Sequence, residues 1–307
     1  MNILIVANHY PVCSARYAAD AFKRLGHDVR HIGPDKGRDI WGLTLPPEYE
    51  WAQDENVADS PDLVILMDSD PFLLDDVKLW QGSPLVVWGV DNHVRDYRRP
   101  HFDHYFLAHR YVSVMNWGHI DPKQSEGAVL FANKDMTHLP CAYDPIAFTP
   151  SPIPFTDREY DVCMLGVMYP KRVELVDAMR KAGLKVIAGA GLVYEAYRDI
   201  HHNSRIALCS SAAGDVAQRV FESAAMGCAV LSDPCGDFDL LKPEGIPTYH
   251  SIEDAVAIAK ALLYSDGRLA QTNIGYSQAW AAPQTWDNRA DVIVKWWEAN
   301  YGASRVS

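Results

Sequence analysis

Residues 205–238, RIALCSSAAGDVAQRVFESAAMGCAVLSDPCGDF, decide the fold of this chain. Two short apolar runs, Ile206 to Cys209 and Ala229 to Ser232, have the length and composition of buried strands. Between them, Asp215 to Met226 has apolar residues at helical spacing, and Gly227 is a suitable residue to end a helix. A strand, a helix and a second strand in this order predict the crossover of a parallel sheet.

The predicted helix has the features of an anion-binding N-terminus. Asp215 and Gln218 have the spacing of a capping box, so we expect the helix to begin at Asp215. The preceding loop, residues 210–214, contains small residues and is expected to leave backbone N–H groups pointing outward. Such groups, together with the helix dipole, attract anions such as a diphosphate.

Arg219 and Glu222 follow on the same predicted helix. Arg219 is cationic, and Glu222 can accept hydrogen bonds from sugar hydroxyls. The simpler interpretation is a solvated pair at i,i+3 spacing, which contributes only about 0.2–0.5 kcal/mol to helix stability. The chemistry of the two side chains alone leaves both interpretations open.

The segment RVFESAAMGCAVLSD, residues 219–233, resembles the donor-site segment of GT-B glycosyltransferases, in particular the CgeB-like group and the family-4-type enzymes (glycosyl transferases group 1). The resemblance implies an α/β fold of two Rossmann-like domains facing a central cleft, with the last helix crossing back to the first domain. It also implies that Glu222 binds the ribose of a nucleotide-sugar and that Arg219 lies by its diphosphate. Family-4 enzymes usually carry a second Glu where this chain has Gly214, beside Asp215. We assign Gly214 and Asp215 to the donor side.

Length and composition bound the class of protein. The chain has 307 residues, enough for two domains, and its net charge of −12 disfavours broad nonspecific binding to DNA or anionic membranes. Six scattered cysteines without a C-x-x-C motif indicate reduced thiols. No apolar run approaches the ~20 residues of a membrane span, and the N-terminus has a strand pattern without the basic region of a signal peptide. We therefore expect a cytoplasmic protein.

The first domain, residues 1–150, begins with the strand–helix–strand pattern of a Rossmann-like domain. The loop after the strand at residues 2–7 has no G-x-G-x-x-G, which argues against nicotinamide binding. Further strands are expected at residues 62–67 and 84–89. Ligands gather at the carboxyl ends of strands in such sheets. The polar residues after three of these strands therefore mark the mouth of the domain, and they include His9, Asp68 and Asp91.

An Arg- and His-rich segment at residues 93–110 is unusual in this acidic chain. It predicts either a solvated helix face with a loop, or a wall that meets a polar or anionic acceptor. We assign to the acceptor side His9, Asp68, Arg95, Arg98 and Arg99. Two histidines, His101 and His104, have i,i+3 spacing, but no further ligand cluster supports a metal site, and none is predicted.

The second domain is expected to span residues 151–284. Residues 139–148, LPCAYDPIAF, resemble the segment that links GT-B domains, and the prolines of residues 150–154 can form a stiff hinge. The entry to the last segment, residues 285–307, resembles the T-W-x-x-R pattern of the CgeB-like group. The resemblance implies that this segment returns to the first domain, with Trp296 and Trp297 as packing residues.

Basic and aromatic residues complete the predicted donor site. Gly166 ends a predicted strand, and Lys171 and Arg172 resemble the basic element that neutralises the donor diphosphate in family-4 enzymes. Basic pairs are common on surfaces, but a cation at a helix start is unfavourable for the dipole, which favours another role. Tyr194 lies in the region that is near the nucleotide base in the family. It could stack on the base or could simply pack.

The resemblance implies a metal-independent hexosyl- or pentosyltransferase that has no cofactor. It would move a sugar from a nucleotide-diphospho-sugar, most simply a UDP-sugar, to a hydroxyl of a glycan, a small molecule or a hydroxylated base in phage-type DNA. If the reaction inverts, Asp91 or His93 would be the general base. Two alternatives stay open: a noncatalytic sugar-nucleotide-binding protein, which Gly214 favours, and a sugar-nucleotide 2-epimerase, which needs a more elaborate acid/base set. The sequence leaves open the stereochemistry and the oligomeric state.

Overall fold

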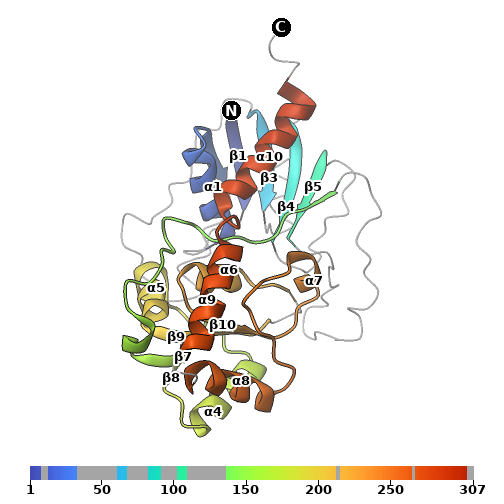
Figure 1. Cartoon of the computed structure of the whole chain (residues 1–307). Helices are drawn as coiled ribbons and strands as arrows, with labels where there is room; N and C mark the ends of the chain where they lie inside the picture. The colour runs from blue at the N-terminus through green and yellow to red at the C-terminus, as the bar shows by residue number, and fades with distance from the viewer. Residues whose placement is uncertain are drawn as a thin grey trace. The chain divides into compact units, whose positions relative to one another are not determined.

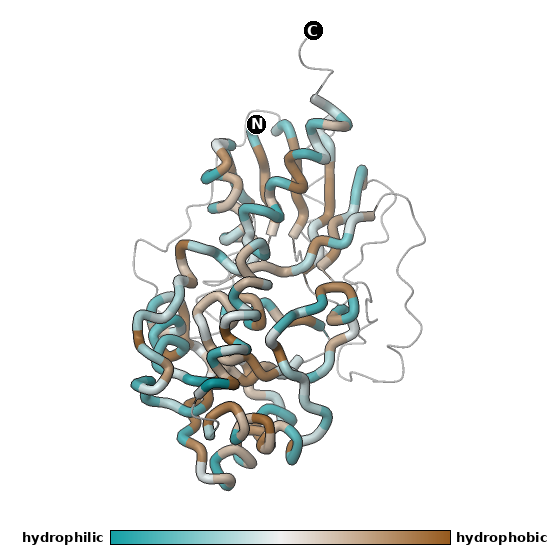
Figure 2. The backbone as a smooth tube through the Cα atoms, in the orientation of Figure 1, coloured by the Kyte–Doolittle hydropathy of each residue, from teal (hydrophilic) through white to brown (hydrophobic). Residues whose placement is uncertain are grey.

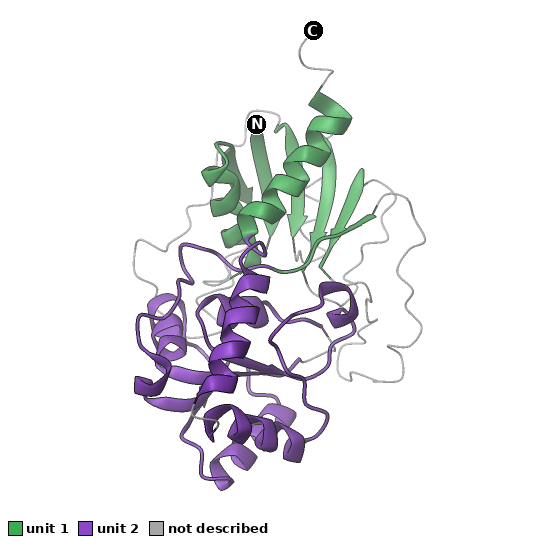
Figure 3. Ribbon diagram, in the orientation of Figure 1, with its two compact units in different colours: residues 1–141, 286–307 green, residues 142–285 purple. Residues whose placement is uncertain are grey.

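The computed structural model describes residues 1–7, 13–32, 61–67, 82–90, 102–108, 136–211, 215–264 and 267–302. The chain divides into two compact units (Figure 3). Unit 1 consists of Met1–Cys141 together with Trp286–Ser307, and unit 2 is Ala142–Thr285. Each unit is built on one parallel β-sheet with helices packed against it (Figure 1).

Unit 1 contains a sheet whose strand order is β2-β1-β3-β4-β5-β6. Its elements are β1 (Asn2–Ala7), α1 (Ser14–Arg24), β2 (Asp28–Ile32), β3 (Leu63–Met67), β4 (Leu85–Gly89), β5 (His104–Leu107), β6 (Met136–His138) and α10 (Trp286–Tyr301). The inner strands are continuous apolar runs because parallel strands are covered on both faces. All five residues of β3 are buried, and Figure 2 shows the inner strands in the hydrophobic colours.

The last helix, α10, packs within unit 1, beside α1 (Figure 1). Trp286 at its start is fully buried, and its ring centroid lies 5.3 Å from that of Trp88 in β4. Arg24 of α1 donates to the Asp287 carboxylate with its Nε at 2.8 Å. The indole N–H of Trp297 donates to the carbonyl of Asp62 at 2.9 Å. Trp297 is therefore a packing residue, as predicted.

The two connections between the units are each fixed by hydrogen bonds. In unit 1, Nε of Arg289 donates to the carbonyl of Pro140 at 2.9 Å, which explains the Arg in the T-W-x-x-R pattern. In unit 2, the N–H of Tyr143 donates to the carbonyl of Gln284 at 3.1 Å, and Tyr143 forms an isolated parallel bridge with Thr285.

The prolines of residues 150–154 lie inside unit 2, whose first residue is Ala142, whereas the sequence suggested a hinge near residue 150. Ser151 fixes this stretch to the unit. Its N–H donates to the carbonyl of Met226 at 3.0 Å, and its hydroxyl donates to the carbonyl of His202 at 2.9 Å. Two bonds to residues that are distant in sequence explain why a stretch with hinge-like composition is held in place.

Unit 2 contains a sheet of order β10-β9-β7-β8. Its elements are the 3₁₀ turn η4 (Phe155–Asp157), β7 (Tyr160–Leu165), α4 (Pro170–Lys181), β8 (Val186–Gly189), α5 (Tyr194–His202), β9 (Ser204–Cys209), α6 (Gln218–Ala225), β10 (Ala229–Ser232), α7 (Phe238–Leu241), α8 (Ile252–Tyr264) and α9 (Arg268–Ala281). The predicted crossover is confirmed, because β9 and β10 are parallel neighbours joined by α6. The predicted capping box of α8 is also confirmed, because the N–H of Asp254 donates to the Ser251 hydroxyl at 3.0 Å.

The predicted start of α6 was wrong. The helix begins at Gln218, and its N-cap Ala217 makes no side-chain cap. The side chains of the expected capping box bind elsewhere: the Asp215 carboxylate accepts the Ser211 hydroxyl at 2.5 Å, and the Gln218 amide donates to Glu222 at 2.6 Å. The helix still ends as predicted, since Gly227 has a φ of 75° and its N–H donates to the carbonyl of Ala224.

A buried arginine holds the entry of unit 2 together. The Arg158 side chain donates to the carbonyl groups of Ile153 at 3.2 Å, Ser204 at 3.0 Å and Gly227 at 2.7 Å. Arg158 is only 6% exposed, so its burial lowers the pKa of the guanidinium below the usual value. The charge is tolerated because carbonyl oxygens surround it.

We expect Arg158→Ala to lower the free energy of unfolding by about 3 kcal/mol, because three carbonyl groups lose a charged donor and a cavity remains. Chemical denaturation with both CD and fluorescence would measure the change. Lys185→Ala is the control, since Lys185 forms an exposed pair with Glu159 and its loss should change little. Equal stability of the two variants would contradict the assignment.

Candidate functional site

The candidate site lies at the carboxyl edge of the unit 2 sheet. There β7 has β8 on one side and β9 on the other. The chain therefore moves along the sheet in one direction from β7 to β8 and in the other direction from β8 to β9. Such a switch point is where ligands bind in open α/β sheets. Gly166 follows β7, and Ser210 follows β9. The sequence-predicted donor residues Gly166, Arg172 and Arg219 meet at this point.

Two guanidinium groups flank Gly166. A Cβ built on Gly166 would overlap Nη2 of Arg219 and would lie 3.7 Å from Nη1 of Arg172. The φ of 121° at Gly166 is also one that residues with a side chain avoid. Glycine at this position therefore lets the turn after β7 approach the Arg219 side chain closely.

Arg172 and Arg219 differ in how their donors are used. Arg172 is buried, and its guanidinium donates to the carbonyl of Ser210 and, at 2.7 Å, to that of Val167. It thereby joins the turn after β7 to the loop after β9. Burial and the neighbouring Arg219 charge lower the pKa of Arg172. Nη1 of Arg219, in contrast, is buried with no hydrogen-bond partner among the described residues.

A buried, unpaired N–H on a guanidinium is costly unless a ligand completes it. Two adjacent positive charges raise that cost further and favour an anion beside them. The planar guanidinium matches the oxygens of a phosphate. The surroundings of Arg219 therefore suit an anion.

Glu222 does not form the solvated pair that was one interpretation of its spacing from Arg219. It is 6% exposed and accepts hydrogen bonds from the Tyr197 hydroxyl at 2.8 Å and the Gln218 amide at 2.6 Å. Burial raises the pKa of the Glu222 carboxyl above its usual value, while the two hydrogen bonds act in the opposite direction. The carboxylate is thus held in one orientation, one turn after Gln218.

Tyr197, which sequence reasoning did not select, supports this carboxylate from α5. Its ring lies 4.3 Å from that of His201 and 6.0 Å from that of Phe148, between centroids. Burial raises the pKa of Tyr197 well above its usual value, so the hydroxyl keeps its proton and remains a donor. Burial also lowers the pKa of His201 to about 4, so that ring is neutral near pH 7.

The side chains of Lys171 and Asp215 both bind other residues of the protein, Asp233 and Ser211 respectively. Nζ of Lys171 lies 2.6 Å from Oδ2 of Asp233, a buried carboxylate that follows β10. The N–H of Ser211 also donates to Asp233, so this described part of the loop does not point its N–H outward as expected. A polar residue directly after a predicted strand was the available signal for Asp233.

Tyr194, the predicted base-stacking residue, begins α5 with a φ of 49°. A non-glycine residue in the left-handed region is uncommon and stores strain that often occurs at functional sites. Tyr194 is half-buried. Its role toward a nucleotide base stays a prediction.

The remaining predicted site residues lie outside the described residues. They are His9, Asp68, Asp91, His93, Arg95, Arg98, Arg99 and Gly214. His101 lies there too, whereas His104 is in β5, where its Nε2 lies 2.9 Å from the Thr137 hydroxyl. Within the described ranges, no group of three or more His, Cys, Asp or Glu residues could hold a metal ion.

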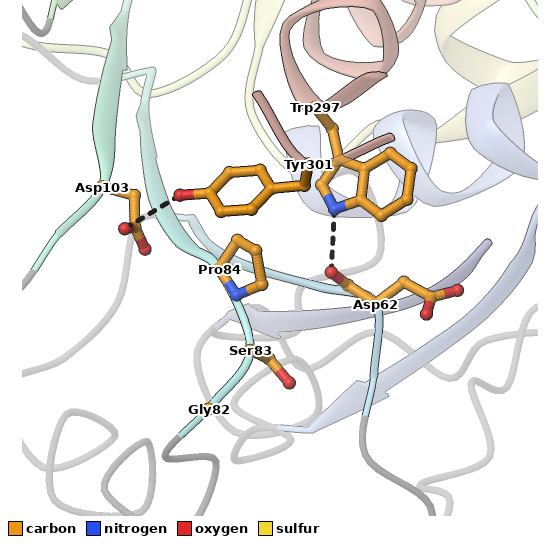
Figure 4. Close-up of a pocket in the computed structure, with 7 residues that line it drawn as sticks. All are labelled: Asp62, Gly82, Ser83, Pro84, Asp103, Trp297 and Tyr301. Carbon is orange, nitrogen blue, oxygen red and sulfur yellow. Dashed lines mark hydrogen bonds between the residues drawn. The ribbon is translucent and has the colours of Figure 1, made fainter. Parts of the chain in front are cut away.

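A pocket of about 400 Å³ lies at the amino-terminal edge of the unit 1 sheet, against α10 (Figure 4). Asp62, Pro84 and Asp103 come from the starts of three strands. The Tyr301 hydroxyl donates to the Asp103 carboxylate at 3.0 Å, beside the bond from Trp297 to Asp62. These contacts attach α10 to the sheet, and parallel sheets bind ligands at the other edge. We therefore favour the Arg219 region as the functional site.

Two further findings concern the cysteines and the described helices. All six cysteines lie in the described ranges and are free thiols, as predicted. Among the described helices, none combines the length and the apolar character needed to span a membrane.

One family model matches part of the chain, including most of unit 2 and the start of α10. Residues 154–295 match the family model described as glycosyl transferase-like, and these residues contain Gly166, Arg219 and Glu222. No curated protein matches the chain.

Solved structures are similar over nearly the whole chain. Sucrose-phosphate synthase from Thermosynechococcus elongatus has a TM-score of 0.64 at 9% identity, covering 98% of this chain and 99% of that one. Anabaena HepE in complex with UDP and glucose has a TM-score of 0.65 at 10% identity, covering 97% and 100%. UDP-GlcNAc 2-epimerase from Neisseria meningitidis, bound to UDP-GlcNAc, has a TM-score of 0.54 at 10% identity, covering 96% and 99%. The likeness shows the fold, and the predicted GT-B class with Rossmann-like domains is confirmed.

Proposed function

We propose that the protein is a glycosyltransferase that moves a sugar from a nucleotide-diphospho-sugar to an acceptor hydroxyl. The observation that carries the proposal is the pair of guanidinium groups at Gly166, one of which has a buried N–H without a partner in the described part of the chain. The match of residues 154–295 to a glycosyl transferase-like model supports the same reaction class. HepE binds UDP and glucose in a similar fold, which favours a UDP-sugar as the donor.

The reaction breaks the bond between the anomeric carbon and the diphosphate. Negative charge builds on the leaving phosphate oxygen, so preorganised positive charge is the main requirement. Arg219 would supply it directly. Arg172 would support the site through the carbonyl groups of Ser210 and Val167 and through its nearby charge. This proposal assigns the charge stabilisation to side chains, without a metal or a cofactor.

Glu222 would bind the ribose hydroxyls of the donor. Tyr197 and Gln218 hold its carboxylate in place before the donor arrives, which lowers the entropy cost of binding. Tyr194 would contact the base. The acceptor would be a glycan or a small molecule. A hydroxylated DNA base is the second candidate, for which Arg95, Arg98 and Arg99 are the predicted phosphate contacts.

The group that receives the proton of the acceptor hydroxyl depends on the stereochemistry of the reaction. In an inverting reaction, Asp91 or His93 would act as the general base. In a retaining reaction, the leaving phosphate could accept the proton, and Asp91 and His93 would orient the acceptor.

A thermal-shift screen with nucleotide-sugars tests the proposal, because a bound donor raises the melting temperature by mass action. Slow release of nucleoside diphosphate from the stabilising donor would support a transferase. Tight binding without turnover on any acceptor would support the noncatalytic binding protein, for which Gly214 is the argument. Conversion of the donor to its 2-epimer would support the epimerase, which shares the fold.

We expect Glu222→Gln to weaken UDP binding by about tenfold, because the substitution keeps the size of the side chain but removes the charge that accepts sugar hydroxyls. Isothermal titration calorimetry would measure the dissociation constant. Glu174→Gln, an exposed change on α4, is the matched control and should bind UDP as the wild type does. Unchanged affinity in Glu222→Gln would remove Glu222 from the site.

A further inference from the structure

The Asp233 carboxylate occupies a place suited to a phosphate. It follows β10, at the same carboxyl edge of the sheet as Ser210, and its side chain is 7% exposed. Nζ of Lys171 lies 2.6 Å from Oδ2. The N–H of Ser211 donates to Oδ1 at 2.9 Å and to Oδ2 at 3.1 Å, and the Ser210 hydroxyl lies 3.5 Å from Oδ2. An ammonium group and a loop N–H that could bind a ligand anion thus bind an anion of the protein itself.

The two partners of this ion pair are unequal. Asp233 is buried and fixed by the loop, whereas the Lys171 side chain is 58% exposed. An ion pair with one exposed partner contributes little to stability, and lysine carries its charge on a flexible stem. Lys171 also lies in the first turn of α4, where the helix dipole disfavours a cation. Lys171 can therefore leave Asp233 at low cost, while the carboxylate stays.

A second carboxylate reinforces the negative charge around the loop. Oδ1 of Asp215 accepts the Ser211 hydroxyl at 2.5 Å, so both hydrogen-bond donors of Ser211 bind carboxylates of the protein. Arg219 provides an N–H without a described partner, and the neighbouring Arg172 donates to the carbonyl of Ser210. The site therefore combines one available positive group with one that is already neutralised.

We propose that Asp233 lowers the affinity of the donor site for anions, because it competes with the donor diphosphate for Lys171. This inference rests on the proposed function, since it names a further residue of the same donor site. When the diphosphate binds, Lys171 moves from Asp233 to the phosphate oxygens. Asp233 keeps its bond from the Ser211 N–H. Its negative charge lowers the affinity of the site for an anion.

Asp233→Asn tests the competition. Asparagine keeps the size and can still accept the Ser211 N–H, but it lacks the charge that holds Lys171. We expect this variant to bind UDP and inorganic pyrophosphate about fivefold more tightly than the wild type in isothermal titration calorimetry. Lys171→Met should bind both more weakly than the wild type. The double variant should bind no more tightly than Lys171→Met alone.

Asp177→Asn is the control for net charge, because it removes an exposed carboxylate from α4 and should leave the affinity unchanged. Equal or weaker binding by Asp233→Asn, with an unchanged melting temperature, would overturn the inference. The same gain in the presence and absence of Lys171 would also overturn it, since it would show a general charge effect. If Asp233→Asn does not fold, unchanged UDP binding by Lys171→Met has the same force.

The same titrations, with GDP as a third ligand, separate this inference from the proposed function. A wild-type protein that binds none of UDP, GDP and pyrophosphate would contradict the donor site as a whole. A wild-type protein that binds UDP, with no gain in Asp233→Asn, would contradict only the competition.

Discussion

Replacing Arg219 by alanine is expected to lower kcat/KM for the nucleotide-sugar by about 10²–10³-fold. The reason is that Arg219 supplies a preorganised charge to the leaving diphosphate, and loss of one such donor has an effect of this size. Its Nη1 is buried without a described partner, so the substitution removes no hydrogen bond of that atom within the described part of the chain. The melting temperature should therefore fall little, or should rise as two neighbouring positive charges become one. Release of nucleoside diphosphate is the measurement.

Arg180→Ala is the matched control for Arg219. Arg180 lies at the end of α4, where it forms a weak exposed pair with Asp177 at 3.9 Å and a long hydrogen bond to the carbonyl of Val186 at 3.5 Å. It should keep wild-type activity. Arg219→Lys tests the planar fork, because lysine keeps the charge but cannot bind two phosphate oxygens side by side. Near wild-type activity in Arg219→Ala would exclude Arg219 from the reaction.

Replacing Gly166 by alanine is expected to lower activity by about 10²-fold. The added Cβ would overlap Nη2 of Arg219, so the guanidinium would have to move. A displacement of about 1 Å in a positioned group can have this effect on rate. The backbone also becomes strained, at about 1 kcal/mol, because φ is 121°.

Gly183→Ala separates the steric effect from the strain. Gly183 also has a positive φ, of 88°, but a Cβ there would meet nothing within 4 Å. Both variants should lose stability to a similar degree in chemical denaturation, and only Gly166→Ala should lose donor affinity and activity. Equal activity of the two variants would show that Gly166 serves the backbone alone.

Much of the fold could be predicted from the sequence because its signals are local. The strands of both sheets are short apolar runs bounded by polar or glycine residues, and the structure places β1, β3, β4, β9 and β10 within or close to the expected limits. The start of α6 could not be predicted in this way. Asp215 and Gln218 have the spacing of a cap, but Ser211 and Glu222 bind their side chains instead.

The candidate site was predictable only in part, for a related reason. Arg219 and Glu222 could be selected from one segment and its resemblance to a family. Tyr197 could not, because it reaches Glu222 from another helix, and its spacing along the chain carries no signal of that contact. The same holds for the pair of Lys171 and Asp233, which joins α4 to the end of β10. Long-range pairs of this kind determine which charges are available to a ligand.

The division of the chain has a consequence for the order of folding during synthesis. Unit 2 is continuous, whereas unit 1 is interrupted and is completed only by residues from Trp286 onward. As the chain leaves the ribosome, every residue of unit 2 is present before α10 exists. Until then the sheet of unit 1 is incomplete, because Trp88 lacks its contact with the indole of Trp286. A premature stop before α10 would therefore damage the unit made first and spare the unit that carries Arg219.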